Sequence, residues 1–294
     1  MFERLVVAYD GSKPAGAAAD LAFELARRRG ARLTLAYVLE LPDPYPELPQ
    51  VAPRIERAEE DWRRRLAALA AGAPDGASVE TEVLVANTPG RALLELLREH
   101  RAEVLVGGTH GVGGLKRTLL GSVSQQLLEH APCSVLLVRD RPRIEGPRTV
   151  VAALDGSGAT PAVLAMAQRA AAVLSAQLVL AHAADELIPS FASIDQKHAL
   201  RALAREQGQR ILAEARGTVT APLEVAEDLR EGRATQQLVA LCHERRPVLT
   251  VVGSRGHHGF AGLLLGSTAR HLVNNAPCPV LVVRTVPNVG AREA

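Results

Sequence analysis

The chain contains two copies of one sequence pattern. Residues 5–12, LVVAYDGS, recur as VVAALDGS at residues 150–157, an offset of 145 positions. Later landmarks keep this offset: Gly108 matches Gly253, Gly121-Ser122 matches Gly266-Ser267, and Ala131-Pro132-Cys133 matches Ala276-Pro277-Cys278. Solenoid repeats run about 20–50 residues, so a period this long indicates duplicated domains.

The segment between the copies has the composition of a linker. Residues 139–148, RDRPRIEGPR, are strongly charged and are interrupted by two prolines and a glycine. We therefore predict one domain at residues 1–140, a second at residues 147–287, and a linker at residues 141–146.

Each copy alternates short apolar runs with longer segments rich in alanine and leucine. In the first copy this predicts strands at Leu5–Tyr9, Arg32–Val38, Val79–Val85, Val104–Val106 and Val135–Val138, and helices at Ala15–Arg29, Arg54–Ala71, Ala92–His100 and Ser122–Glu129. Nearly continuous apolar strands separated by helices are typical of a parallel sheet covered on both faces. Each half is predicted to be a doubly wound α/β domain, in which ligands bind at the carboxyl ends of the strands.

Charge and composition argue against several classes of partner. The net charge is only +2 and aromatic residues make up 3%, so the chain lacks the basic field and the stacking platforms used to bind nucleic acid. The longest weakly polar stretch, residues 170–184, is shorter than the roughly 20 residues that span a bilayer. Three cysteines without a CxxC pair predict neither a disulfide framework nor a thiolate metal site. We expect a cytoplasmic protein that binds neither nucleic acid nor membrane.

An aspartate follows the first strand of each half, with Gly-Ser directly after it. The carboxylates of Asp10 and Asp155 could accept hydrogen bonds from a sugar hydroxyl or a base amine. They could equally accept backbone N–H groups in an Asx turn or cap the next helix. The residues alone leave both interpretations open.

A second motif follows the fourth strand in both halves. Two residues separate Gly108 from Gly111, nine more lead to Gly121-Ser122, and the second half repeats these counts from Gly253. Glycines let backbone N–H groups approach an anion, and a helix that begins at Gly-Ser has amides without intrahelical partners. The motif therefore predicts a phosphate site.

Capping alone is the alternative, because Ser122 with Gln125 also has the spacing of a capping box. The second half has Arg270 at the position of Gln125, so Gly-Ser itself is what both copies share. A P-loop is rejected because no Gly-Lys occurs, and the dinucleotide fingerprint is rejected because Asp10-Gly11-Ser12 occupies the first turn.

These motifs, together with the closing Ala-Pro-Cys before an apolar strand, resemble the ATP-binding branch of the universal stress protein family. The resemblance covers both halves. It implies two tandem doubly wound parallel sheets of five strands in the order 3-2-1-4-5, a fold of the adenine nucleotide alpha hydrolase-like type. Such proteins often dimerise through the last strand, and tandem members resemble a fused dimer.

By the same resemblance, each half would hold one ATP. Asp10 and Asp155 would contact the adenosine, the backbone of Val38 and Ala183 would contact the adenine edge, and the glycine motif would hold ribose and phosphates. The implied nucleotide-binding residues are Asp10, Val38, Gly108, His110, Gly111, Gly121, Ser122 and Val123 in the first half, and Asp155, Ala183, Gly253, Arg255, Gly256, Gly266, Ser267 and Thr268 in the second. His110 and Arg255 would face the anion, or else be solvated loop charges, and the triphosphate could bring Mg²⁺ or Mn²⁺.

The expected function is nucleotide-dependent binding in the stress response. Asp10 follows the first strand, where the family places adenosine, so it is poorly placed as a base at the γ-phosphate. We therefore expect no enzyme activity. The alternatives are a slow ATPase or autophosphorylation at Ser122 or Ser267, and a structural adaptor with vestigial sites. We expect a homodimer because exposed terminal strands favour edge pairing; the sequence identifies no regulatory partner.

Overall fold

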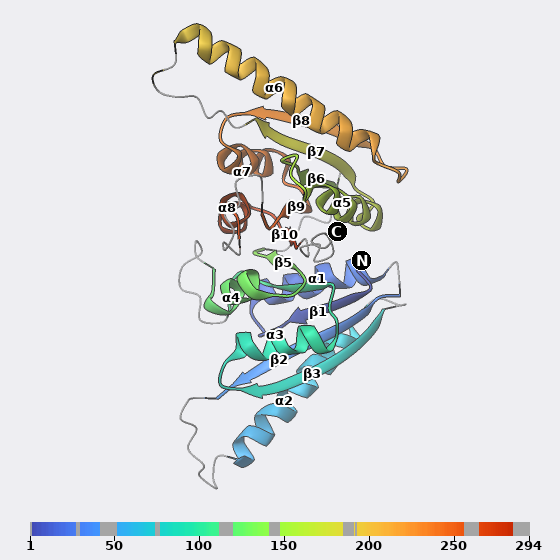
Figure 1. Cartoon of the computed structure of the whole chain (residues 1–294). Helices are drawn as coiled ribbons and strands as arrows, with labels where there is room; N and C mark the ends of the chain where they lie inside the picture. The colour runs from blue at the N-terminus through green and yellow to red at the C-terminus, as the bar shows by residue number, and fades with distance from the viewer. Residues whose placement is uncertain are drawn as a thin grey trace, which may run out of the picture.

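The computed structural model joins the two halves into one sheet of ten strands (Figure 1). It describes residues 2–27, 30–41, 52–73, 77–111, 120–140, 148–184, 191, 193–255 and 265–284. The predicted linker, residues 141–146, lies outside the described residues.

The elements of both halves follow one another in the same order. The first half consists of β1 (Arg4–Ala8), α1 (Lys13–Arg27), β2 (Arg32–Glu40), α2 (Ala52–Ala71), β3 (Ser78–Ala86), α3 (Pro89–Glu99), β4 (Val104–Gly108), α4 (Ser122–His130) and β5 (Ser134–Val138). The second consists of β6 (Thr149–Ala153), α5 (Thr160–Leu174), β7 (Gln177–Ala184), α6 (Ile194–Gly217), β8 (Val225–Glu231), α7 (Ala234–Arg245), β9 (Leu249–Gly253), α8 (Ser267–Asn275) and β10 (Val280–Val283).

The sheet order confirms the predicted fold class. The strands run β3-β2-β1-β4-β5-β10-β9-β6-β7-β8, so each half has the order 3-2-1-4-5. All pairs within a half are parallel, and the two halves meet at the antiparallel pair of β5 and β10.

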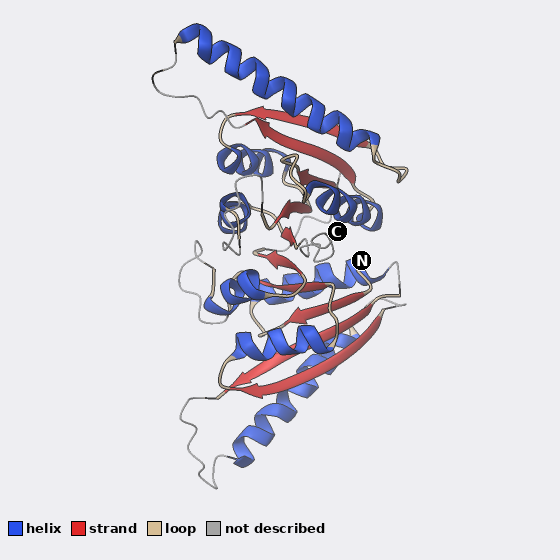
Figure 2. Ribbon diagram, in the orientation of Figure 1, coloured by secondary structure: helices blue, strands red, loops and turns tan. Residues whose placement is uncertain are grey.

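Helices cover both faces of this sheet (Figure 2). One hydrophobic cluster is formed with α1, α2, α5 and α6, and a second with α3, α4, α7 and α8. The central strands, such as β1, β5 and β9, are buried and nearly all apolar, as the sequence pattern predicted, whereas the edge strands β3 and β8 are partly exposed and carry charged residues. In folds of this kind, ligands bind at the loops that follow the carboxyl ends of the strands.

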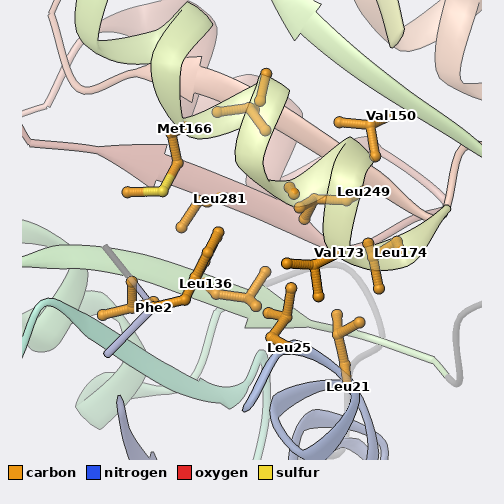
Figure 3. Packing of buried hydrophobic residues seen from close by; sticks show 14 of the residues in the cluster. Phe2, Leu21, Leu25, Leu136, Val150, Met166, Val173, Leu174, Leu249 and Leu281 are labelled. Carbon is orange, nitrogen blue, oxygen red and sulfur yellow. The ribbon is translucent and has the colours of Figure 1, made fainter. Parts of the chain in front are cut away.

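The seam between the halves is a continuous part of the core. Leu136 of β5 is paired with Leu281 of β10, and neither side chain is exposed to solvent. Figure 3 shows these leucines between Leu25 of α1 and Met166 of α5. The two halves therefore share one core rather than touching through a surface.

Two matching arginines tie each half to the other. Arg139, just after β5, donates to the carbonyl oxygens of Val273 and Asn274 near the end of α8. Arg284, just after β10, donates to the carbonyl oxygens of Leu128 and Glu129 near the end of α4. Burial lowers the pKa of both guanidinium groups. A cation at the carboxyl end of a helix is also favoured by the helix dipole.

Losing either arginine should weaken the seam. We expect Arg284→Ala to lower the free energy of unfolding by about 1–2 kcal/mol, because it leaves helix-end carbonyls without these donors. Urea denaturation of the full chain measures this. Arg210→Ala, which removes only an exposed pair with Glu206, should change stability by less than about 0.5 kcal/mol. Equal losses in the two variants would contradict a tying role for Arg284.

The pairing of β5 with β10 removes the reason for which a homodimer was expected. The last strands β5 and β10 pair with each other inside one chain, so neither is an exposed edge. The edge strands are instead β3 and β8. A homodimer of this chain stays a prediction, but edge pairing through the last strand cannot be its cause.

The structure also bears on the predictions about membrane spans, disulfides and metal sites. None of the described helices is long and apolar enough to cross a membrane. Cys133, Cys242 and Cys278 are free thiols, and all three are buried. Within the described part of the chain, no cluster of three or more His, Cys, Asp or Glu side chains could hold a metal ion.

Candidate functional site

A cavity of about 820 Å³ opens at the carboxyl ends of β6, β7 and β9. The strand order reverses between β6 and β9, which is where doubly wound sheets bind ligands. The volume of the cavity lies within the range of about 300–1,000 Å³ typical of small-molecule sites. The predicted residues that line it are Asp155, Ala183, Gly253, Arg255, Gly266, Ser267 and Thr268. Gly256, the other predicted residue of this half, lies outside the described residues.

Asp155 forms an Asx turn and keeps one oxygen available. The Ser157 N–H donates to Asp155 Oδ1 over 3.0 Å, and the Thr160 hydroxyl lies 3.4 Å from the same oxygen. Asp10 repeats the turn, with the Ser12 N–H 3.0 Å from its Oδ1. The turn interpretation is thus confirmed, yet no described group donates to Asp155 Oδ2, which can still accept from a ligand.

The first turn of α8 presents free amides to the cavity. Gly266 is the N-cap residue, and its own N–H donates to the Ser254 carbonyl over 2.7 Å. The N–H groups of Ser267, Thr268 and Ala269 come next and have no acceptor among the described residues, while all three residues line the cavity. Such an array attracts an anion.

The capping-box alternative is wrong for the first half. The N-cap of α4 is Gly121, Ser122 is already helical, and no side chain caps this helix end. The Ser124 hydroxyl donates instead to the Gly108 carbonyl over 2.9 Å. The amides at the start of α4, including that of Val123, are therefore left without side-chain caps.

Two of the predicted glycines have a packing role. A Cβ on Gly108 would lie 2.9 Å from Pro14 Cβ and 3.0 Å from the Ala15 nitrogen, at the first turn of α1. A Cβ on Gly253 would lie 3.3 Å from Ala159 Cβ. These contacts explain both glycines without a ligand, so their predicted contact with ribose or phosphate stays untested.

The predicted cationic residues are placed differently in the two halves. His110 is half-buried; its Nδ1 lies 2.8 Å from the Thr109 hydroxyl, and its Nε2 is buried with no partner in the described part of the chain. Arg255 is exposed and lines the cavity. Burial, and then the charge of Arg255, lower the pKa of Arg284.

An aromatic cluster in the first half has no counterpart among the described residues of the second. Trp62 of α2 stacks on Tyr37 of β2 with ring centroids 3.6 Å apart, and it lies edge-on to Tyr9 at 6.5 Å. A Cβ on Gly11 would come within 3.2 Å of the indole. Burial, and then the carboxylate of Asp10, raise the pKa of Tyr37. The indole therefore lies directly beside the predicted adenosine contact of this half.

Comparison with known proteins decides the family. The sequence profile of the universal stress protein family matches residues 1–139 and again residues 147–284. The chain belongs to this family. Universal stress protein Rv2005c of Mycobacterium tuberculosis is 32% identical over 303 residues, which covers 95% of this chain and 96% of that protein.

Solved structures of similar length share the fold. A universal stress protein from Archaeoglobus fulgidus superposes with a TM-score of 0.68 at 18% identity, covering 95% of this chain and 97% of that one. Protein PA1789 of Pseudomonas aeruginosa gives a TM-score of 0.70 at 20% identity, covering 96% and 92%. These structures show the fold, and the family match in each half shows the tandem arrangement.

In this universal stress protein, the sequence motifs predicted one group of residues that line the cavity and did not single out others near the candidate sites. The repeated Asp and glycine motifs bring the second-half residues to one cavity, as predicted. Trp62, Tyr37 and His182, which lie beside the two Asx turns, were not singled out. The one signal available was that the single tryptophan of the chain occurs in a predicted helix, residues 54–71.

Proposed function

We propose that this universal stress protein binds an adenine nucleotide, ATP, in the cavity at the carboxyl ends of β6, β7 and β9, and acts in the stress response through the nucleotide that it holds. The observation that carries the proposal is the cavity itself. It combines an aspartate at one strand end with a helix start at another; among the described residues, neither Asp155 Oδ2 nor the amides of Ser267, Thr268 and Ala269 have a hydrogen-bond partner.

The groups suit the parts of a nucleotide. Asp155 Oδ2 would accept a hydrogen bond from a ribose hydroxyl or the base amine, and the backbone of Ala183 would meet the base edge. The amides of Ser267, Thr268 and Ala269 would hold phosphate oxygens, with on the order of 1 kcal/mol from the helix dipole. The Arg255 charge would add attraction for the polyphosphate.

We propose binding rather than turnover. Asp155 would lie at the adenosine end of the nucleotide, and its side chain is held by the hydrogen bond that it accepts from the Ser157 N–H. It is therefore not placed to activate water at the γ-phosphate. A divalent cation, Mg²⁺ or Mn²⁺, would arrive with the triphosphate. Binding of nucleotide to a cytoplasmic protein of this kind would then favour one state of an interface with a partner.

Asp155→Asn tests the adenosine end of the site. The amide side chain preserves Oδ1 as the turn acceptor but puts a donor where Oδ2 accepted. We expect the dissociation constant for ATP, measured by equilibrium dialysis, to rise about tenfold, equivalent to about 1.4 kcal/mol. Asp195→Asn, at an exposed position in the first turn of α6, is the control and should bind as the parent does.

The native ligand can be identified on the same protein. Purified protein is denatured, and any released small molecule is identified by mass spectrometry. The proposal expects an adenine nucleotide. An unchanged dissociation constant for ATP in Asp155→Asn would show that Asp155 does not contact the nucleotide. A wild-type chain that retains no adenine nucleotide in either experiment would refute nucleotide binding.

A further inference from the structure

The two halves differ at one structurally equivalent position beside the site. Leu66 of α2 and Leu212 of α6 are both fully buried in the same cluster. Four residues before each of them stand Trp62 and Gly208. Trp62 stacks on Tyr37 of the second strand, whereas a Cβ on Gly208 would lie 2.6 Å from Leu229 Cδ1 and 2.8 Å from Cδ2 of His182, the residue that matches Tyr37.

In the first half the indole occupies the space beside the second strand. One face of Trp62 stacks on Tyr37, and the guanidinium of Arg65 lies 4.9 Å from the centre of the indole. Its edge reaches the turn at Gly11 that follows Asp10. An indole packed in this way leaves no free face on which a base could stack.

In the second half Gly208 lets the side chains of Leu229 and His182 pack against α6, and the cavity borders His182 there. The cavity extends along α6, where Ala204, Gln207 and Ile211 line it together with His182 and Leu154. His182 therefore borders an open volume where Tyr37 borders an indole.

His182 offers an acceptor to that volume. Its side chain is 9% exposed, and its Nδ1 lies 2.7 Å from the Leu154 carbonyl oxygen. A carbonyl only accepts, so Nδ1 carries the proton and Nε2 of the neutral ring is an acceptor. No described group donates to Nε2, and His182 lines the cavity. A ligand with an exocyclic amine would satisfy this nitrogen.

We infer that the second half provides the base pocket of the chain, that Trp62 fills the equivalent space in the first half, and that His182 selects a base carrying an exocyclic amine. This inference rests on the proposed function and refines it. The full chain should therefore bind one ATP, not two, and should prefer ATP to inosine triphosphate, in which an oxygen acceptor replaces the amine.

Stoichiometry and fluorescence test the base pocket. Trp62 is the only tryptophan, so its emission reports on the first half. Titration of wild type with ATP should reach saturation at one nucleotide per chain by calorimetry and leave Trp62 emission unchanged. Two nucleotides per chain, or an emission change that follows saturation, would overturn the inference.

Closing variants test the same pocket from the other side. Gly208→Trp should abolish ATP binding. If this variant fails to fold, Ala204→Trp is the substitute, because Ala204 lines the cavity and its replacement leaves Gly208 unchanged. Gly217→Trp, on the same helix with nothing within 4 Å of its Cβ position, should bind as wild type. Retained binding in a folded closing variant overturns the inference, whereas absent binding in wild type instead refutes the proposed function.

His182→Phe tests the selection of the base. Wild type should bind ATP about tenfold more tightly than inosine triphosphate, since one buried hydrogen bond would separate them. In His182→Phe the ATP affinity should fall to that of inosine triphosphate, with little change for the latter. A purely structural loss would weaken both nucleotides alike, and a preserved preference for ATP would exclude His182 as the selecting residue.

Discussion

Replacing Leu281 with aspartate is expected to cost more than about 4 kcal/mol of folding free energy, because it buries an unpaired charge in the shared core. Leu281 is fully buried and is paired with Leu136 at the antiparallel seam (Figure 3). Since stability of native proteins is only about 5–15 kcal/mol, such a loss should unfold most of the chain or abolish soluble expression.

Chemical denaturation followed by circular dichroism gives the measurement. Leu203→Asp is the matched control, since Leu203 is 58% exposed on α6, and it should shift stability by no more than about 0.5 kcal/mol. A Leu281→Asp protein as stable as the control would show that the halves do not share a core through β5 and β10.

Gly108→Val is expected to lower the free energy of unfolding by about 3 kcal/mol through overpacking. Its Cβ would lie 2.9 Å from Pro14 Cβ, 3.0 Å from the Ala15 nitrogen and 3.1 Å from the Pro14 carbonyl carbon. Two of these atoms are backbone, so α1 must move away from the end of β4 rather than a side chain rotating aside.

Gly121→Ala provides the comparison for Gly108. The nearest atom to its Cβ position, the Thr109 carbonyl oxygen, is 3.7 Å away, and its backbone is extended. We expect a change below about 1 kcal/mol, since neither glycine nor alanine has a side chain that accepts from the helix amides and no strain is introduced. Thermal unfolding compares the two variants. Equal melting temperatures would mean that the close approach of α1 to Gly108 is not a structural requirement.

Most of the fold could be predicted because the repeated motifs lie at the ends of strands. Apolar strands such as Val135–Val138, alternating with helices, leave few right-handed topologies, and both halves have the strand order that the family resemblance implied. Element ends were less well predicted: α2 begins at Ala52 and β2 extends to Glu40. Strand and helix ends depend on tertiary contacts that a local pattern does not contain.

The union of the two sheets could not be predicted from local patterns. Strands β5 and β10 have the same apolar character whether they pair within the chain or with a second copy. Arg139 and Arg284 hold the seam, but in the sequence they look like ordinary charges after a strand. Only the three-dimensional arrangement shows that each reaches a helix of the other half.

The difference between the two candidate sites was hidden by a change of offset. At the offset of 145 that the motifs keep, Trp62 would be matched with Gln207. In the structure the equivalent of Trp62 is Gly208. Tyr37 pairs with Val83 and His182 pairs with Leu229, so the match between the halves has shifted from 145 to 146 by the third strand. The residues between β2 and α2, where such a shift could arise, lie largely outside the described part of the chain.

A crystal structure of the full chain with a non-hydrolysable ATP analogue would examine the site itself. It should show the phosphate groups at the amides of Ser267 and Thr268 and the adenine beside His182, in the second half. An analogue bound elsewhere, or a cavity left empty under saturating analogue, would contradict the account.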